Sequence, residues 1–167
     1  MTTPSEIPGK GIYATASFTP AAAAYAAGDI MSTAKEFKFR YADDSPVAPG
    51  SLIRIYSTIL RIDTTALQAS EAAYTLPLYN ITPPSAQADN AAWALASADL
   101  PYYEGKLALG TPVDEGAALY VKTQLTANQD MRLTLATGTS LFGELITVAG
   151  FTATAVARQV TLIGVVL

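Results

Sequence analysis

The chain contains no histidine and no cysteine, and this absence removes whole classes of chemistry. Ser-His-Asp and Cys-His nucleophile systems need a histidine, and zinc sites are built mainly from His and Cys ligands. Disulfides are excluded as well. The chain also lacks a G-x-x-x-x-G-K-[ST] segment, the loop that cradles phosphates in P-loop proteins. We therefore predict a protein that is not an enzyme and that carries no cofactor.

Charge is scarce in this sequence. Charged residues make up 14% of the chain, against roughly 25% in an average soluble domain. The net charge is −4 without any run of Lys or Arg, so we expect no nucleic-acid partner. No stretch approaches the roughly 20 apolar residues that span a bilayer, so we expect no membrane partner. Residues 1–11 lack a signal-peptide pattern, which predicts a protein made in a cytoplasm and used there or packaged from it.

Hydrophobic residues nevertheless make up half of the chain. A surface so poor in Lys and Glu tends to associate, which favours assembly with other copies or with a partner surface. The alternative is a monomer whose outer faces consist of Ser, Thr and Ala.

The length of 167 residues fits one domain. Residues 1–24 are punctuated by Pro and Gly, which predicts an N-terminal arm, and residues 25–167 form the predicted domain. Short β-type runs separated by turns follow, which is typical of a sandwich or barrel. Residues 52–62 form the longest predicted strand, and their alternation slips around Ser57–Thr58, which predicts a bulge or a bend. Pro77 predicts that the run over residues 73–79 either lies at a sheet edge or ends at the proline.

Residues 80–104 form an unusually long connection that contains Pro83-Pro84. Asp89 is a suitable N-cap for a short helix over residues 90–96. A connection of this length inside a compact domain is usually functional or has structure of its own. Trp93 within it either closes the end of the sandwich or contacts a partner, and the sequence leaves both open.

The chain has fourteen carboxylates, and two of them could in principle face each other as a glycosidase pair. Most lie beside turns, where Asp bends and caps the backbone. Asp43, Asp44 and Asp63 could offer oxygen atoms to calcium, but the chain has no D-x-D-x-D-G loop. We therefore predict neither a catalytic nor a metal site.

Nine tyrosines supply apolar area together with a hydrogen-bonding tip, which suits strand faces, subunit contacts and sugar platforms. Tyr102 and Tyr103 are adjacent, so both cannot face inward in an extended strand. The candidate interface residues are Trp93, Tyr102 and Tyr103 in the long connection and Tyr13 in the arm.

A series of short motifs spans residues 25–123. In order they are Tyr25-Ala-Ala-Gly28-Asp29-Ile30, the aromatic strand 37–41, the strand 52–62, Leu76-Pro-Leu-Tyr79, Pro83-Pro84, Asp89-Asn90-Ala-Ala-Trp93, Asp99-Leu100 and Tyr103-Glu-Gly105. In this order they resemble the head decoration (cement) proteins of tailed bacteriophages. The resemblance implies a jelly-roll-type antiparallel β-sandwich, here with an extended arm and one long, partly helical crossover. It also implies a homo-oligomer, with a trimer favoured, that bridges major capsid protein subunits on the capsid exterior.

The sequence thus predicts a structural decoration protein of the virion, present in the host cytoplasm during assembly. Avidity is the expected mechanism, since a symmetric oligomer adds weak equivalent contacts into tight attachment. The alternative is a carbohydrate-binding module of a virion head or tail fibre that uses exposed tyrosines as stacking surfaces. A glycosidase is a third and weaker possibility.

Overall fold

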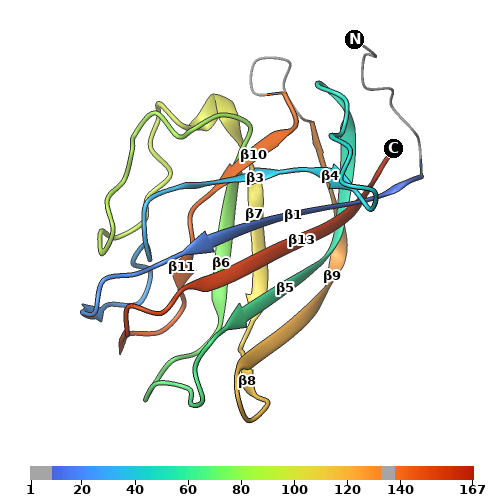
Figure 1. Ribbon diagram of the computed structural model, residues 1–167. Coiled ribbons are helices and arrows are strands. Elements are labelled where there is room, and N and C mark those ends of the chain that lie inside the picture. Colours follow the sequence, from blue (N-terminus) through green and yellow to red (C-terminus); the bar gives the residue numbers. More distant parts are fainter. Residues whose placement is uncertain (1–8, 133–137) are drawn as a thin grey trace.

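The computed structural model describes residues 9–132 and 138–167, with side-chain environments given for residues 9–126 and 138–167. They form an all-β sandwich with two main sheets (Figure 1). The first sheet has the order β4 (Arg40–Tyr41), β1 (Gly11–Phe18), β13 (Arg158–Val166), β5 (Leu52–Ile62), β9 (Leu119–Arg132), β8 (Val113–Asp114). The second has the order β11 (Ile146–Thr147), β6 (Tyr74–Tyr79), β10 (Ser140–Gly143), β3 (Lys35–Lys38), with β7 (Tyr103–Gly110) also paired to β6. A small ladder joins β12 (Phe151–Thr152) to β2 (Ala24–Tyr25).

The strand pairing is that of a jelly roll. In chain order, the principal strands are β1, β3, β5, β6, β7, β9, β10 and β13. The first pairs with the last, the second with the seventh, the third with the sixth and the fourth with the fifth, all antiparallel. This is the pattern of one long hairpin rolled into two facing sheets. The predicted fold class is therefore confirmed.

The core lies between the two sheets and follows from alternation along the strands. In β13 every second residue is buried, from Arg158 to Val166, and β1 buries Ile12, Ala14, Ala16 and Phe18. The residues between them face outward. Such a period of two places one face of each strand on the core and leaves the other available to solvent or a partner.

The bulge predicted in the strand 52–62 is confirmed. In the pairing of β5 with β13, Ile55 and Ser57 lie opposite the consecutive residues Gly164 and Ile163, which leaves Tyr56 as the extra residue with 39% of its surface exposed. The pairing of β5 with β9 is also irregular between Ile55 and Ser57. A Cβ at Gly164 would lie 2.3 Å from the carbonyl oxygen of Arg54, so the bulge brings two backbones so close that only glycine fits.

The sandwich begins earlier than the sequence predicted. Residues 11–18, assigned to the arm 1–24, form β1 between β4 and β13. Its inward side chains include Ala14 and Ala16, whose small size makes the alternation weak in the sequence. The first eight residues of the predicted arm lie outside the described residues.

Both alternatives predicted for Pro77 are wrong, because β6 lies between β7 and the pair β10 and β11 and continues past Pro77 to Tyr79. Its carbonyl oxygen accepts a hydrogen bond from the Glu144 amide (3.2 Å), in the gap between β10 and β11. The N–H that proline lacks would face this same gap, where the partner strand is interrupted. A central strand therefore accommodates the proline at a break in the neighbouring ladder.

The predicted helix over residues 90–96 does not form. Asn90 has a left-handed backbone (φ 63°), and its amide donates to the carbonyl oxygen of Ile30. The amide of Ile30 donates to Ala91, and the amide of Trp93 donates to Gly28. These pairings use the backbone groups that a helix needs. The helical part of the connection is the short 3₁₀ turn Leu100–Tyr102, called η1.

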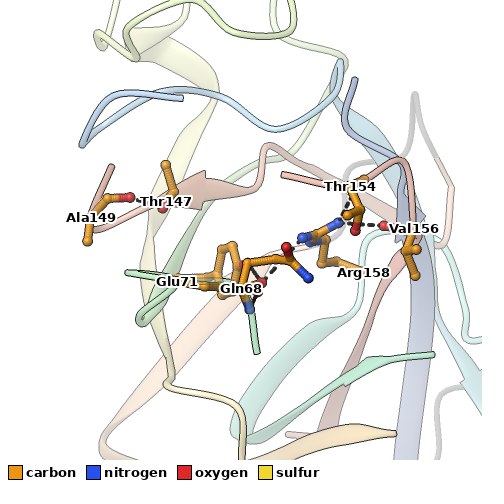
Figure 2. Close-up of polar contacts among 8 residues, drawn as sticks. Gln68, Glu71, Thr147, Ala149, Thr154, Val156 and Arg158 are labelled. Atoms are coloured by element: carbon orange, nitrogen blue, oxygen red, sulfur yellow. Dashed lines mark hydrogen bonds and ion pairs between the residues drawn. The ribbon is translucent and has the colours of Figure 1, made fainter. Parts of the chain in front are cut away.

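A buried ion pair joins the two sheets at one end (Figure 2). Arg158, at the start of β13, is 1% exposed and lies 3.3 Å from the Glu71 carboxylate, in the loop before β6. Its guanidinium also donates to the carbonyl oxygens of Thr154 (2.9 Å) and Val156 (2.6 Å). Glu71 accepts hydrogen bonds from the Tyr74 hydroxyl and the Gln68 amide as well. Burial, followed by the bond to Glu71, raises the pKa of the Tyr74 hydroxyl.

Candidate contact surfaces of the sandwich

The crossover, residues 80–104, covers the outer face of the second sheet around Tyr79, whereas Glu36 and Lys38 of β3 are exposed. Leu76 and Leu78 of β6 belong to the core, whereas Tyr79 is fully buried outside it. The Trp93 indole N–H donates to the Tyr79 hydroxyl (3.1 Å), which donates to a carboxylate oxygen of Glu144 (3.2 Å). This chain of hydrogen bonds fixes the crossover to the sheet beneath it. We call this side the covered face.

Trp93 is packed from above as well as bonded from below. The Lys106 ammonium lies 3.6 Å from the centre of the Trp93 ring, a cation–π contact. Burial lowers the pKa of Lys106. One face of the indole is thus occupied by a side chain of the same chain, on the ring that would suit sugar stacking best.

Glu144 is a fully buried carboxyl of this cluster. It is 0% exposed, and within the described part of the chain one of its oxygens, Oε1, has no hydrogen-bond partner. Burial raises the pKa of Glu144, and the nearby Asp99 raises it further. Burial is also the first cause of the raised pKa of Tyr79. The cluster holds the crossover in place by polar contacts under an aromatic cover.

Asp89 anchors the other side of the crossover instead of capping a helix. Its carboxylate accepts hydrogen bonds from the Tyr25 hydroxyl (2.8 Å), the Ser32 amide (2.6 Å) and the Ala21 amide (3.1 Å). Burial and the bond to Asp89 raise the pKa of Tyr25 to about 12. Residues near β2, which are distant in sequence, therefore hold the crossover from the side.

The structure groups three of the four predicted interface residues on the covered face. The rings of Tyr79 and Tyr103 lie 5.7 Å apart, so Trp93 and Tyr103 meet through Tyr79. Tyr102 is half-buried in η1, and its carbonyl oxygen accepts a hydrogen bond from the Asn80 amide (2.9 Å). Tyr13 lies apart from them in β1 of the first sheet, and its hydroxyl donates to Asp44.

Within residues 9–132 and 138–167, no segment covers the outer face of the first sheet in this way. In Figure 1, β1, β13 and β5 cross in front of β6 and β7, and the crossover loops lie behind and to the side. We call this side the open face. Tyr13 pairs with Ile163, and Thr161 pairs with both Thr15 and Ile59. These side chains are partly exposed, so the face is a mixture of hydroxyl and apolar groups.

The charges on the open face escaped sequence reasoning. Four outward residues of β4, β5 and β9 are basic, namely Arg40, Arg54, Arg61 and Lys122. They are scattered over more than eighty positions in the chain, and the strand order brings them onto one face. The outward alternation of Arg54, Arg61 and Lys122 with buried neighbours was the available signal, but it does not reveal which strands are adjacent.

Two hollows border these faces. One of about 340 Å³ is lined by open-face residues, including Ser17, Arg61 and Gln159. The other, about 250 Å³, lies between β7 and β9, where the edges of the two sheets meet. There the Thr123 hydroxyl donates to the carbonyl oxygen of Leu109 (2.7 Å) and links the two edges.

Among the described residues, no helix is long and apolar enough to cross a membrane. Within the same residues, no group of three or more His, Cys, Asp or Glu side chains is placed to hold a metal ion.

No protein-family model matches this chain, and no curated protein matches its sequence. Among solved structures, the empty capsid of Triatoma virus is 12% identical, with 93% of this chain and 84% of that chain covered and a TM-score of 0.27. A second Triatoma virus structure is 13% identical, with 90% and 61% covered and a TM-score of 0.28. A maize chlorotic mottle virus structure is 8% identical, with 93% of both chains covered and a TM-score of 0.26. These similarities are weak, and the jelly-roll assignment rests on the strand pairing within this chain.

Proposed function

We propose that this protein is a non-enzymatic structural component of a virus particle, a decoration protein that attaches to the outside of a tailed-phage head. The observation that carries the proposal is the contrast between the two faces. The crossover covers the second sheet around Tyr79, whereas none of the described segments lies over the partly apolar outer face of the first sheet. An uncovered sheet face of this kind is suited to attachment to another protein surface.

In this proposal the open face lies against the major capsid protein and bridges neighbouring subunits. A homotrimer would present three equivalent faces, and avidity would convert weak contacts into tight attachment. Binding to the assembled shell alone would stabilise that shell by linkage. The sequence resemblance to head decoration proteins supports this assignment, as does the scarcity of charge in the chain.

The alternative of a carbohydrate-binding module draws less support from the geometry. Trp93 is held by Tyr79 from below and by Lys106 from above. Tyr13 is bonded to Asp44 through the hydroxyl that a sugar would use. Saturable binding on a glycan array would favour this alternative over the capsid role.

The test is to add the purified protein to expanded phage heads that lack a decoration protein and to count bound copies per capsid subunit. We expect saturation at a simple ratio and a raised melting temperature of the shell. The control is the same protein added to unexpanded heads, which lack the mature lattice. Absence of saturable binding to expanded heads would contradict the proposed function.

A further inference from the structure

The open face is basic within a protein that is acidic overall. The net charge of the chain is −4, yet the strands β1, β4, β5 and β13 contain no Asp or Glu at any position. In β9 the segment 119–126 contains none, but Asp130 further along the strand lies opposite Arg54 in the register. The charged side chains that these strands direct outward are the basic residues Arg40, Arg54, Arg61 and Lys122.

Acidic side chains lie at the rim of this face. Asp43 and Asp44 follow β4 on one side, and Asp114 and Glu115 lie at the β8 edge on the other. On the β4 side the rim charges already have partners in the chain, because the Lys10 ammonium lies 3.0 Å from Asp43 and the Tyr13 hydroxyl donates to Asp44. Lys122 and Arg61 thus lie inside this border, although the exposed Asp63 lines the same hollow as Arg61. Arg40 lies on the edge strand β4, and Arg54 lies opposite Asp130.

Between the basic groups the face is flat and partly apolar. Ile59, Ile163 and Val165 are partly exposed there, and the hydroxyls of Thr15 and Thr161 lie 2.9 Å apart and satisfy each other. Such a surface can lose its water at small cost where the hydroxyls are paired, while the basic groups select the partner by charge. The combination fits a broad protein surface.

We propose that the open face docks onto an acidic protein surface and that Arg61 and Lys122 supply charge complementarity for this contact. This inference rests on the proposed function in that the acidic surface belongs to the capsid lattice. A second copy placed face to face by a two-fold axis is disfavoured, because it would bring basic groups together. Nucleic acid is disfavoured because the acidic rim would repel phosphates.

The test compares two double variants of equal charge in the expanded-head binding experiment. Arg61→Glu with Lys122→Glu reverses the open face, and Lys35→Glu with Lys38→Glu reverses two basic residues of β3 in the second sheet. We expect the open-face variant to lose affinity about 30-fold or more and the β3 variant to stay within about threefold of wild type, as buried interface charges but not remote ones determine affinity. We also expect wild-type binding to weaken as salt is raised. Melting temperatures of both variants verify folding.

The outcomes separate this inference from the proposed function. If wild type binds heads and both variants bind equally well, the docking inference is overturned and the capsid role stands. If wild type does not bind heads, the capsid role fails, and amide chemical shifts decide the inference, with a polyglutamate peptide and a DNA duplex as probes. Shifts confined to β5, β9 and β13 with the peptide would support an acidic protein partner. Shifts elsewhere, equal shifts with DNA, or a change of oligomeric state in the open-face variant would each overturn it.

Discussion

The polar side chains on the two outer faces of the sandwich differ in their contacts. On the covered face, the side chains of Trp93, Tyr79 and Glu144 are bonded to one another under the crossover. On the open face, polar groups point outward from the strands, and no segment in the described part of the chain lies over them. The residues that look most like contact residues in the sequence, a Trp and a pair of Tyr, are largely used within the molecule. The residues that look like ordinary strand positions form the open face.

The difference between the two outer faces exists only while the two sheets are held together. We expect the largest loss of stability from substitution at the Arg158–Glu71 pair. Glu71→Ala leaves a buried guanidinium without its carboxylate and removes the acceptor of the Tyr74 hydroxyl. Removing one member of a buried pair typically costs about 3–5 kcal/mol. We therefore expect a comparable loss in the free energy of unfolding, measured by urea denaturation.

The control for this experiment removes both charges. Glu71→Leu combined with Arg158→Met leaves no isolated charge in the interior, so we expect it to recover most of the lost stability. If the single variant were as stable as wild type, the ion pair would not be what joins the sheets at this end.

The bulge in the open sheet gives the second largest effect. At Gly164 an added methyl group would lie 2.3 Å from the carbonyl oxygen of Arg54, whereas at Gly11 nothing lies within 4 Å. We expect Gly164→Ala to lower the free energy of unfolding by about 3 kcal/mol, since overpacking of a tight site costs about 1–3 kcal/mol or more. Gly11→Ala is the matched control and should be near neutral. Equal stability of the two variants would show that the strands separate at the bulge without cost.

Some parts of this arrangement follow from the sequence and others do not. The alternation in residues 52–62 and its slip are local, so the strand and its bulge could be predicted. In β1, Ala14 and Ala16 bury so little area that the alternation was obscured by nearby Pro and Gly. The helical propensity around Ala91 and Ala92 was overridden, because residues 90–93 pair with residues 28–30 far away in the chain.

The candidate contact residues could also be predicted from the sequence only in part. Trp93 and Tyr103 were identified from residue type alone, but residue type does not show that Lys106 and Tyr79 enclose the indole. The basic character of the open face depends on the strand order β4-β1-β13-β5-β9, which is a property of the rolled hairpin. Neighbouring charges from separate strands become visible only when that order is known.

Substitution of one aromatic residue on each face tests the difference directly. Trp93→Ala removes a half-buried ring and its bond to Tyr79, so we expect a loss of about 2 kcal/mol in stability, below the range of about 3–5 for a fully buried ring. Tyr13→Ala removes a more peripheral side chain, and a loss below about 1 kcal/mol is expected, as for most surface substitutions. Binding to expanded heads should instead be weakened more by Tyr13→Ala than by Trp93→Ala. A Trp93→Ala variant of full stability with abolished binding would place the contact on the covered face instead.

The smallest effect concerns pH. Burial raises the pKa of Glu144 in the folded state, so the folded protein holds this proton more tightly than the unfolded chain does. Stability from this group is therefore fully present at pH values below the pKa of an unfolded Glu and is lost as pH rises through the folded value. Glu144→Gln keeps the size of the side chain and an oxygen that can accept from Tyr79, but it cannot ionise. Relative to wild type, its free energy of unfolding should thus rise as pH increases from 4 to about 8. Asp114→Asn, at the exposed β8 edge, is the control and should show no comparable trend. A difference that stays flat with pH would mean that water reaches Glu144 and that the crossover does not seal the covered face.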